Sequence, residues 1–62
     1  MYQVSIKAAR VNAGMNRRQV AEALGVTERT VFNWEQQRTA IPIDMFKRMC
    51  DLYSVPIQLV RL

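Results

Sequence analysis

The sequence predicts an all-α fold, a compact domain of five short helices that spans residues 1–62. Two glycines and two prolines divide the chain into short segments at Gly14, Gly25, Pro42 and Pro56. Half of the 62 residues are hydrophobic, which is enough for a packed core and argues against disorder. No segment alternates clearly between apolar and polar residues, so we expect no β-strand.

The first helix is expected from about Ser5 to Ala13, and Gly14 follows it in the position that commonly ends a helix. On a helical wheel, Arg10 shares one face with the apolar side chains of this helix. A charge inside an apolar stripe needs a partner, because a buried unpaired charge is costly. The sequence therefore predicts that Arg10 pairs with a group elsewhere in the chain.

The second and third helices begin with the same local pattern. Asn16 is a favoured N-cap, and Gln19 follows three residues later, which is the spacing of a capping box. The second helix is expected to end at Gly25, where the chain can turn through a positive φ at little cost. Thr27 then caps a third helix, residues 28–36. Its apolar side is narrow, so it presents a wide polar face outward.

The fourth helix is expected to begin near Pro42, a residue favoured in the first turn. A last short helix is expected after Pro56, over Ile57–Arg61. It carries more apolar residues than one short helix can bury on one side. The apolar residues of the fourth helix recur at helical spacing and predict its buried face: Ile43, Phe46, Met49, Cys50 and Tyr53.

Composition excludes several classes of function. One cysteine cannot form an internal disulfide, and a chain with no histidine has few ligands for a metal, so we expect no metal site and no cofactor. Nothing in the sequence resembles an enzyme site. No apolar run is long enough to span a membrane, and residues 1–7 lack the features of a signal peptide, so we expect a cytoplasmic protein. The net charge of +4 suggests a polyanionic partner only in general terms.

The pattern of small and apolar residues around the second and third helices resembles the helix-turn-helix domain of the Cro and phage-repressor (Xre-like) family. Ala21 allows two helices to approach, Gly25 follows at the turn, and Val31 and Trp34 follow at the expected spacing. The similarity covers residues 6–59. It implies a lambda-repressor-like fold in which the second and third helices form the helix-turn-helix.

Two features of the family concern the structure of the domain and not its contacts with DNA. The resemblance implies that Arg10 pairs with Glu35, which agrees with the need of Arg10 for a partner. Gln37 and Ser54 stand where relatives often have glycine. If either residue keeps a left-handed conformation it costs roughly 1 kcal/mol, and otherwise the loop takes a different shape.

The outward face of the third helix holds the candidate base-reading residues. Arg29 can pair with guanine and Asn33 with adenine through two hydrogen bonds each. Glu28 either stabilises the helix dipole, accepts a hydrogen bond from cytosine, or orients a neighbouring arginine. Phe32 either contacts thymine methyl groups or packs against a neighbouring helix. The resulting set of base-reading candidates is Glu28, Arg29, Phe32 and Asn33.

A second set of residues is expected to contact DNA phosphates. Arg17 lies at the positive end of the second helix, where a cation is unfavourable unless an anion binds there. Arg18 has an alternative partner in Glu22, and capping is an alternative role for Asn16 and Thr27. The complete set of phosphate-binding candidates is Asn16, Arg17, Arg18, Thr27, Thr30, Arg38 and Thr39.

The resemblance implies double-stranded DNA as the partner, with a near-palindromic operator bound by a homodimer that forms in solution or only on DNA. It implies no small-molecule ligand and no membrane partner. The protein would be a bacterial or phage-encoded, nucleoid-associated transcriptional regulator, most simply a phage-type repressor. The alternatives are an antitoxin that regulates its own gene and a protein-interaction module without DNA binding. The candidate subunit surface, which could instead face a continuation of the chain, is Tyr53, Val55, Ile57, Leu59 and Leu62.

Overall fold

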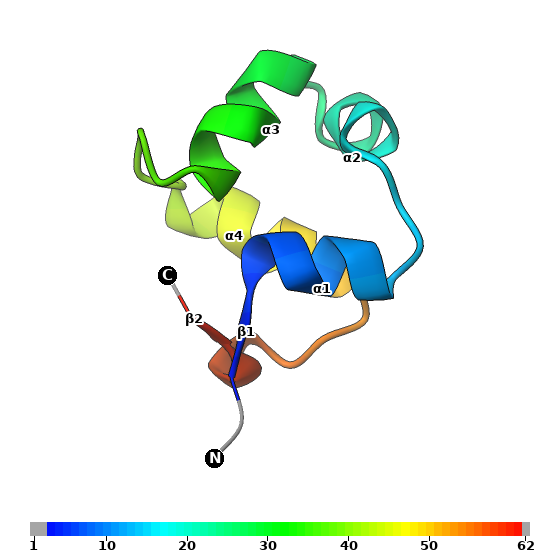
Figure 1. Cartoon of the computed structure of the whole chain (residues 1–62), viewed down its shortest axis with the longest axis vertical. Helices are drawn as coiled ribbons and strands as arrows, with labels where there is room; N and C mark the ends of the chain where they lie inside the picture. The colour runs from blue at the N-terminus through cyan, green and yellow to red at the C-terminus, as the bar shows by residue number, and fades with distance from the viewer. Residues whose placement is uncertain (1–2, 62) are drawn as a thin grey trace.

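A computed structural model describes residues 3–61 as four α-helices and a short two-stranded sheet (Figure 1). The helices α2 and α3 lie side by side at one end of the molecule, and α1 and α4 lie beneath them. The elements in chain order are β1 (Val4–Ser5), α1 (Ile6–Asn12), α2 (Arg17–Leu24), α3 (Glu28–Glu35), α4 (Ile43–Leu52), the 3₁₀ turn η1 (Ile57–Leu59) and β2 (Val60–Arg61). None of the helices in residues 3–61 is long and apolar enough to cross a membrane.

Side-chain caps fix where the first helices begin. The Ser5 hydroxyl accepts a hydrogen bond from the Ala8 amide at 3.0 Å, so α1 starts one residue later than expected. The Asn16 side chain accepts from the Gln19 amide at 2.8 Å, and the Gln19 side chain accepts from the Asn16 amide at 2.9 Å. The predicted capping box is therefore formed at the start of α2.

Every helix ends in a left-handed turn. Gly14 follows α1 with a φ of 73° and Gly25 caps α2 with a φ of 71°. Gln37 and Ser54 take the same conformation after α3 and α4, with φ values of 59° and 55°. Both turns thus keep the geometry that glycine favours, and each includes a residue for which that geometry is strained.

The turn after α3 is held by two backbone hydrogen bonds. The Gln37 amide donates to the Trp34 carbonyl at 3.1 Å, and the Arg38 amide donates to the Asn33 carbonyl at 2.9 Å. This pair of bonds is the Schellman motif, which satisfies carbonyls that a helix end leaves free. Gln37 therefore adopts the left-handed conformation that glycine would favour at this helix end.

The fifth helix predicted over Ile57–Arg61 is present only as a 3₁₀ turn over Ile57–Leu59, and the expectation that the chain contains no strand is wrong. A single 3₁₀ turn is followed by β2, which pairs in parallel with β1 so that Val4 faces Val60. Five residues are too few for a stable isolated helix, and β-branched valines favour an extended conformation when a partner strand is present. The sheet also places Val60 in the core.

One hydrophobic core joins the helices to β2. The predicted buried face of α4 is correct except for Ile43, which is 60% exposed because it lies in the first turn, beyond the edge of the core. The buried apolar side chains are Ile6, Ala9, Val20, Ala21, Leu24, Val31, Trp34, Phe46, Met49, Cys50, Tyr53 and Val60.

Candidate functional site

The angle between α2 and α3 is set by small and branched apolar residues. Ala21 and Val31 are buried, and the Val26 amide donates to the Ala21 carbonyl at 3.0 Å across the turn. A small side chain at residue 21 lets the two helices pack closely. The opposite side of α3 is therefore left facing away from the core.

That outward side of α3 carries the predicted base-reading residues. Glu28 and Arg29 are exposed in its first turn, and Phe32 and Asn33 are half-buried one turn further on. Glu28 also lies at the helix N-terminus, where a negative charge is favourable. The structure thus brings all four residues onto one helix, with Arg29 and Asn33 four positions apart on neighbouring turns.

The aromatic ring of Phe32 is the centre of an arginine cluster. The guanidinium carbons of Arg17, Arg29 and Arg38 lie 5.1, 5.8 and 5.8 Å from the ring centroid. These arginines come from the first turn of α2, the first turn of α3 and the loop after α3. We name the four residues Phe32, Arg17, Arg29 and Arg38 the arginine cluster.

Four of the remaining phosphate-binding candidates have side-chain partners within the chain, namely Asn16, Arg18, Thr27 and Thr30. Arg18 Nε donates to Glu22 at 3.1 Å in an exposed ion pair, which contributes little to stability. The Thr27 hydroxyl accepts from the Thr30 amide at 3.1 Å and caps α3. The side chain of Asn16 likewise caps α2. Thr39 lies exposed in the loop that follows Arg38.

The predicted ion pair between Arg10 and Glu35 is present beneath this surface. Arg10 Nε donates to Glu35 Oε2 at 2.7 Å, and Arg10 Nη1 donates to the Met15 carbonyl at 2.8 Å. The Glu35 side chain is 0% exposed. One guanidinium thus joins α1, the connection to α2 and the last residue of α3.

Tyr53 lies close to this ion pair and within the core. It is 5% exposed, so in this conformation it cannot belong to the predicted subunit surface. Among residues 3–61, its hydroxyl has no hydrogen-bond partner. The pKa of Tyr53 is raised to about 12, chiefly by burial and next by the charge of Glu35, while Arg10 acts in the opposite direction.

The other residues of the predicted subunit surface are placed unevenly. Val55 and Leu59 are half-buried, and Ile57 is 39% exposed. Leu62 lies outside the described residues. Cys50 is a core residue, as expected. Burial, and to a smaller extent the charge of Asp51, raises the pKa of its thiol. The higher pKa makes the thiol less reactive.

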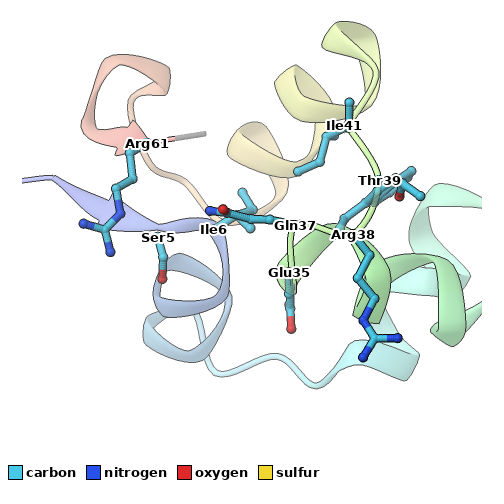
Figure 2. A pocket seen from close by; sticks show the side chains of 10 residues that line it. Ser5, Ile6, Glu35, Gln37, Arg38, Thr39, Ile41 and Arg61 are labelled. Carbon is cyan, nitrogen blue, oxygen red and sulfur yellow. The ribbon is translucent and has the colours of Figure 1, made fainter.

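A cavity of about 370 Å³ lies between the loop after α3 and the ends of the sheet (Figure 2). Arg38 and Arg61 lie on either side of Glu35 in this view. The Glu35 carboxylate is already paired with Arg10, so the described residues that line the cavity offer no uncommitted acid or base. No group of three or more potential metal ligands occurs in residues 3–61.

Sequence reasoning missed the arginine cluster. Arg29 and Phe32 are three residues apart on one helix, and this spacing is sufficient to predict their contact. The approach of Arg17 and Arg38 to the same ring depends on the packing of α2 and on the loop after α3. No local pattern in the sequence indicates either contact.

Comparisons with known proteins give one match. The model of a protein family described as helix-turn-helix matches residues 6–60 of the chain. No curated protein and no solved structure matches it.

Proposed function

The chain belongs to the Cro/C1-type helix-turn-helix family, which is DNA-binding and non-enzymatic, and on this premise we propose that it is a sequence-specific transcriptional regulator of the phage-repressor type. In this proposal α2 and α3 form the helix-turn-helix, and α3 enters the major groove of duplex DNA. The arginine cluster on the outward side of α3 is the observation that carries the proposal.

The dimensions of α3 suit this role. An α-helix with its side chains is about 10–12 Å across, and the major groove of B-DNA is about 12 Å wide, so the eight-residue helix α3 fits into the groove. Arg29 would read guanine through O6 and N7, and Asn33 would read adenine. Glu28 would accept from cytosine N4 or hold Arg29 in position.

Phosphate contacts would fix the position of α3 in the groove. Arg17 and Arg38 flank α3, one on α2 and the other in the following loop. The first backbone amides of α2 have no acceptor within the helix, so they can donate hydrogen bonds to a phosphate oxygen. Secondary phosphate contacts would come from Asn16, Arg18, Thr27, Thr30 and Thr39.

A single domain contacts few base pairs, so we propose that two copies bind a near-palindromic operator. Within the predicted subunit surface, Ile57 is exposed, and Val55 and Leu59, which lie two residues from it in the sequence, are half-buried. No cofactor is needed for binding of this kind.

Selection from a random duplex library at a stated salt concentration tests the proposal directly. Arg29→Ala is expected to cost about 1–3 kcal/mol on the selected site and to relax the preference at one base pair. Arg17→Ala should weaken all duplexes alike and reduce the slope of log affinity against log salt by about one contact.

Lys47→Ala is the matched control, because it removes an exposed positive charge on α4, away from the arginine cluster. It should leave the sequence preference and the salt slope unchanged. If the parent protein binds no duplex at any salt concentration, the proposal is wrong and a protein-interaction module becomes the better reading. Unchanged binding by both Arg29→Ala and Asn33→Ala would show that α3 does not read bases.

A further inference from the structure

We propose that Phe32 is a positioning residue, whose ring holds Arg17, Arg29 and Arg38 as one preorganised clamp for DNA and makes no base contact of its own. This inference rests on the proposed function and assigns one residue of that site a different task. It replaces the thymine-methyl contact that the sequence suggested for Phe32.

A different local structure fixes the backbone at each of the three arginines. Arg17 lies between Asn16 and Gln19, the two residues of the capping box that starts α2. Arg29 lies in the first turn of α3, which Thr27 caps. Arg38 follows the left-handed residue after α3, and its amide is bonded to the Asn33 carbonyl at 2.9 Å. Each long side chain is thus fixed at one end by the backbone and restrained at the other by the Phe32 ring.

The attraction to the ring opposes a repulsion among the charges. All three guanidinium carbons lie within the roughly 6 Å range of a cation–π contact. The sum of two of these distances is the largest separation that two of the guanidinium carbons can have. It is comparable to the Debye length of about 10 Å at 0.1 M salt, so salt screens the three charges from one another only partly. The negative face of the ring offsets part of this repulsion, and a polyanion in contact with the cluster relieves the rest.

The same geometry limits what Phe32 can offer to a base. Its ring is half-buried and has three guanidinium groups around it. A thymine methyl group would have to displace one of them, and the arginine would lose its contact with the ring. Holding the arginines instead reduces the side-chain freedom that they lose when DNA binds, which is a direct gain in affinity.

Double-mutant cycles separate the two roles of Phe32. Phe32→Leu keeps an apolar side chain but removes the aromatic ring. It should weaken binding to the selected duplex on the order of tenfold and to random duplex by a smaller factor, because Arg29 reads a base only in the selected duplex. Arg17→Ala, Arg29→Ala and Arg38→Ala should each have a smaller effect in the Phe32→Leu background than in the parent. Phe32→Trp, which keeps a cation–π surface, should restore parental affinity.

Thermal melting of each variant shows that it is folded, and Phe32→Met serves in place of Phe32→Leu if the latter is not. Lys47→Ala should be additive with either change, because Lys47 is outside the arginine cluster. The proposal is overturned if the arginine effects are additive with the change at Phe32. It is also overturned if the loss is confined to duplexes with thymine at one position. Failure of the parent protein to bind any duplex would instead refute the proposed function.

Discussion

The side chain of Glu35 is completely removed from solvent, and both of its oxygens face the guanidinium of Arg10. A buried ion pair is often no more stabilising than two apolar residues of similar size, because both charges lose their hydration. Removing one partner is much more costly than removing both, since a charge is then left alone in the core. This asymmetry makes the pair testable.

Arg10→Ala is expected to lower the free energy of unfolding by about 3 kcal/mol, because it leaves the Glu35 carboxylate buried without its partner. The double variant Arg10→Met, Glu35→Leu should lose less than the sum of the corresponding single variants. Urea unfolding at low temperature measures all of these variants. Purely additive losses would mean that the two charges do not interact in the folded state.

The hydroxyl of Tyr53 has no partner in the described part of the chain, so Tyr53→Phe is expected to leave stability unchanged or to raise it by about 1 kcal/mol. Tyr53→Ala is the contrasting variant, because it removes the ring as well and opens a cavity that should cost about 3 kcal/mol or more. Urea unfolding at neutral pH measures both. A loss of stability in Tyr53→Phe would show that the hydroxyl is hydrogen-bonded.

The same hydroxyl predicts a loss of stability in alkali. The pKa of Tyr53 is raised from 10 in the unfolded chain to about 12 in the folded state, so the folded state holds the proton more tightly. The resulting stabilisation is present below pH 10 and is lost as the pH rises towards 12, by roughly 1.4 kcal/mol per pH unit. Tyr53→Phe should lack this contribution, whereas the titration of Cys50 is common to both proteins.

At the scale of helices and turns, the strained residues Gln37 and Ser54 offer the clearest experiment. Gln37→Gly and Ser54→Gly should each raise the free energy of unfolding by about 1 kcal/mol, because glycine adopts the left-handed conformation without strain. Gln36→Gly is the control, since residue 36 has a negative φ and glycine there should be neutral or destabilising. Equal effects at residues 36 and 37 would contradict the argument from backbone strain.

The starts of α2 and α3 follow from the sequence because their capping residues can be recognised in it. Asn16 and Thr27 each accept a hydrogen bond from the amide three residues further on, so the information they carry is local. The segment after Pro56 was misjudged because its conformation depends on β1, which lies at the other end of the sequence. Ile43 was misjudged because helical spacing identifies a face of a helix and says nothing of how far the core extends along it.

In the candidate site, too, local features can be predicted from the sequence, whereas contacts between distant segments cannot. Helical spacing places the base-reading candidates together on α3. The apolar face of the first helix predicts only that Arg10 has a partner, and the family resemblance identifies that partner as Glu35. The gathering of Arg17 and Arg38 around Phe32 is tertiary, so it appears only once α2 and the loop after α3 are in place.

For the whole molecule, the longest dimension is 32 Å, close to the separation of about 34 Å between half-sites one DNA turn apart. Two copies on such half-sites would meet only over a small area, so their association should depend on DNA. We expect cooperative binding when half-site centres are about 10 base pairs apart and none when they are about 15 apart. Sedimentation with and without duplex measures the assembly, and affinity that does not vary with spacing would contradict it.

The pairing of β1 with β2 has a consequence for the order of events in time. A helical turn needs only neighbouring residues, whereas this sheet requires that almost the whole chain first be folded back on itself. The sheet should therefore form last and open first. The packing of α2 on α3 lies elsewhere in the molecule, so brief separation of the strands would leave the outward side of α3 undisturbed (Figure 1).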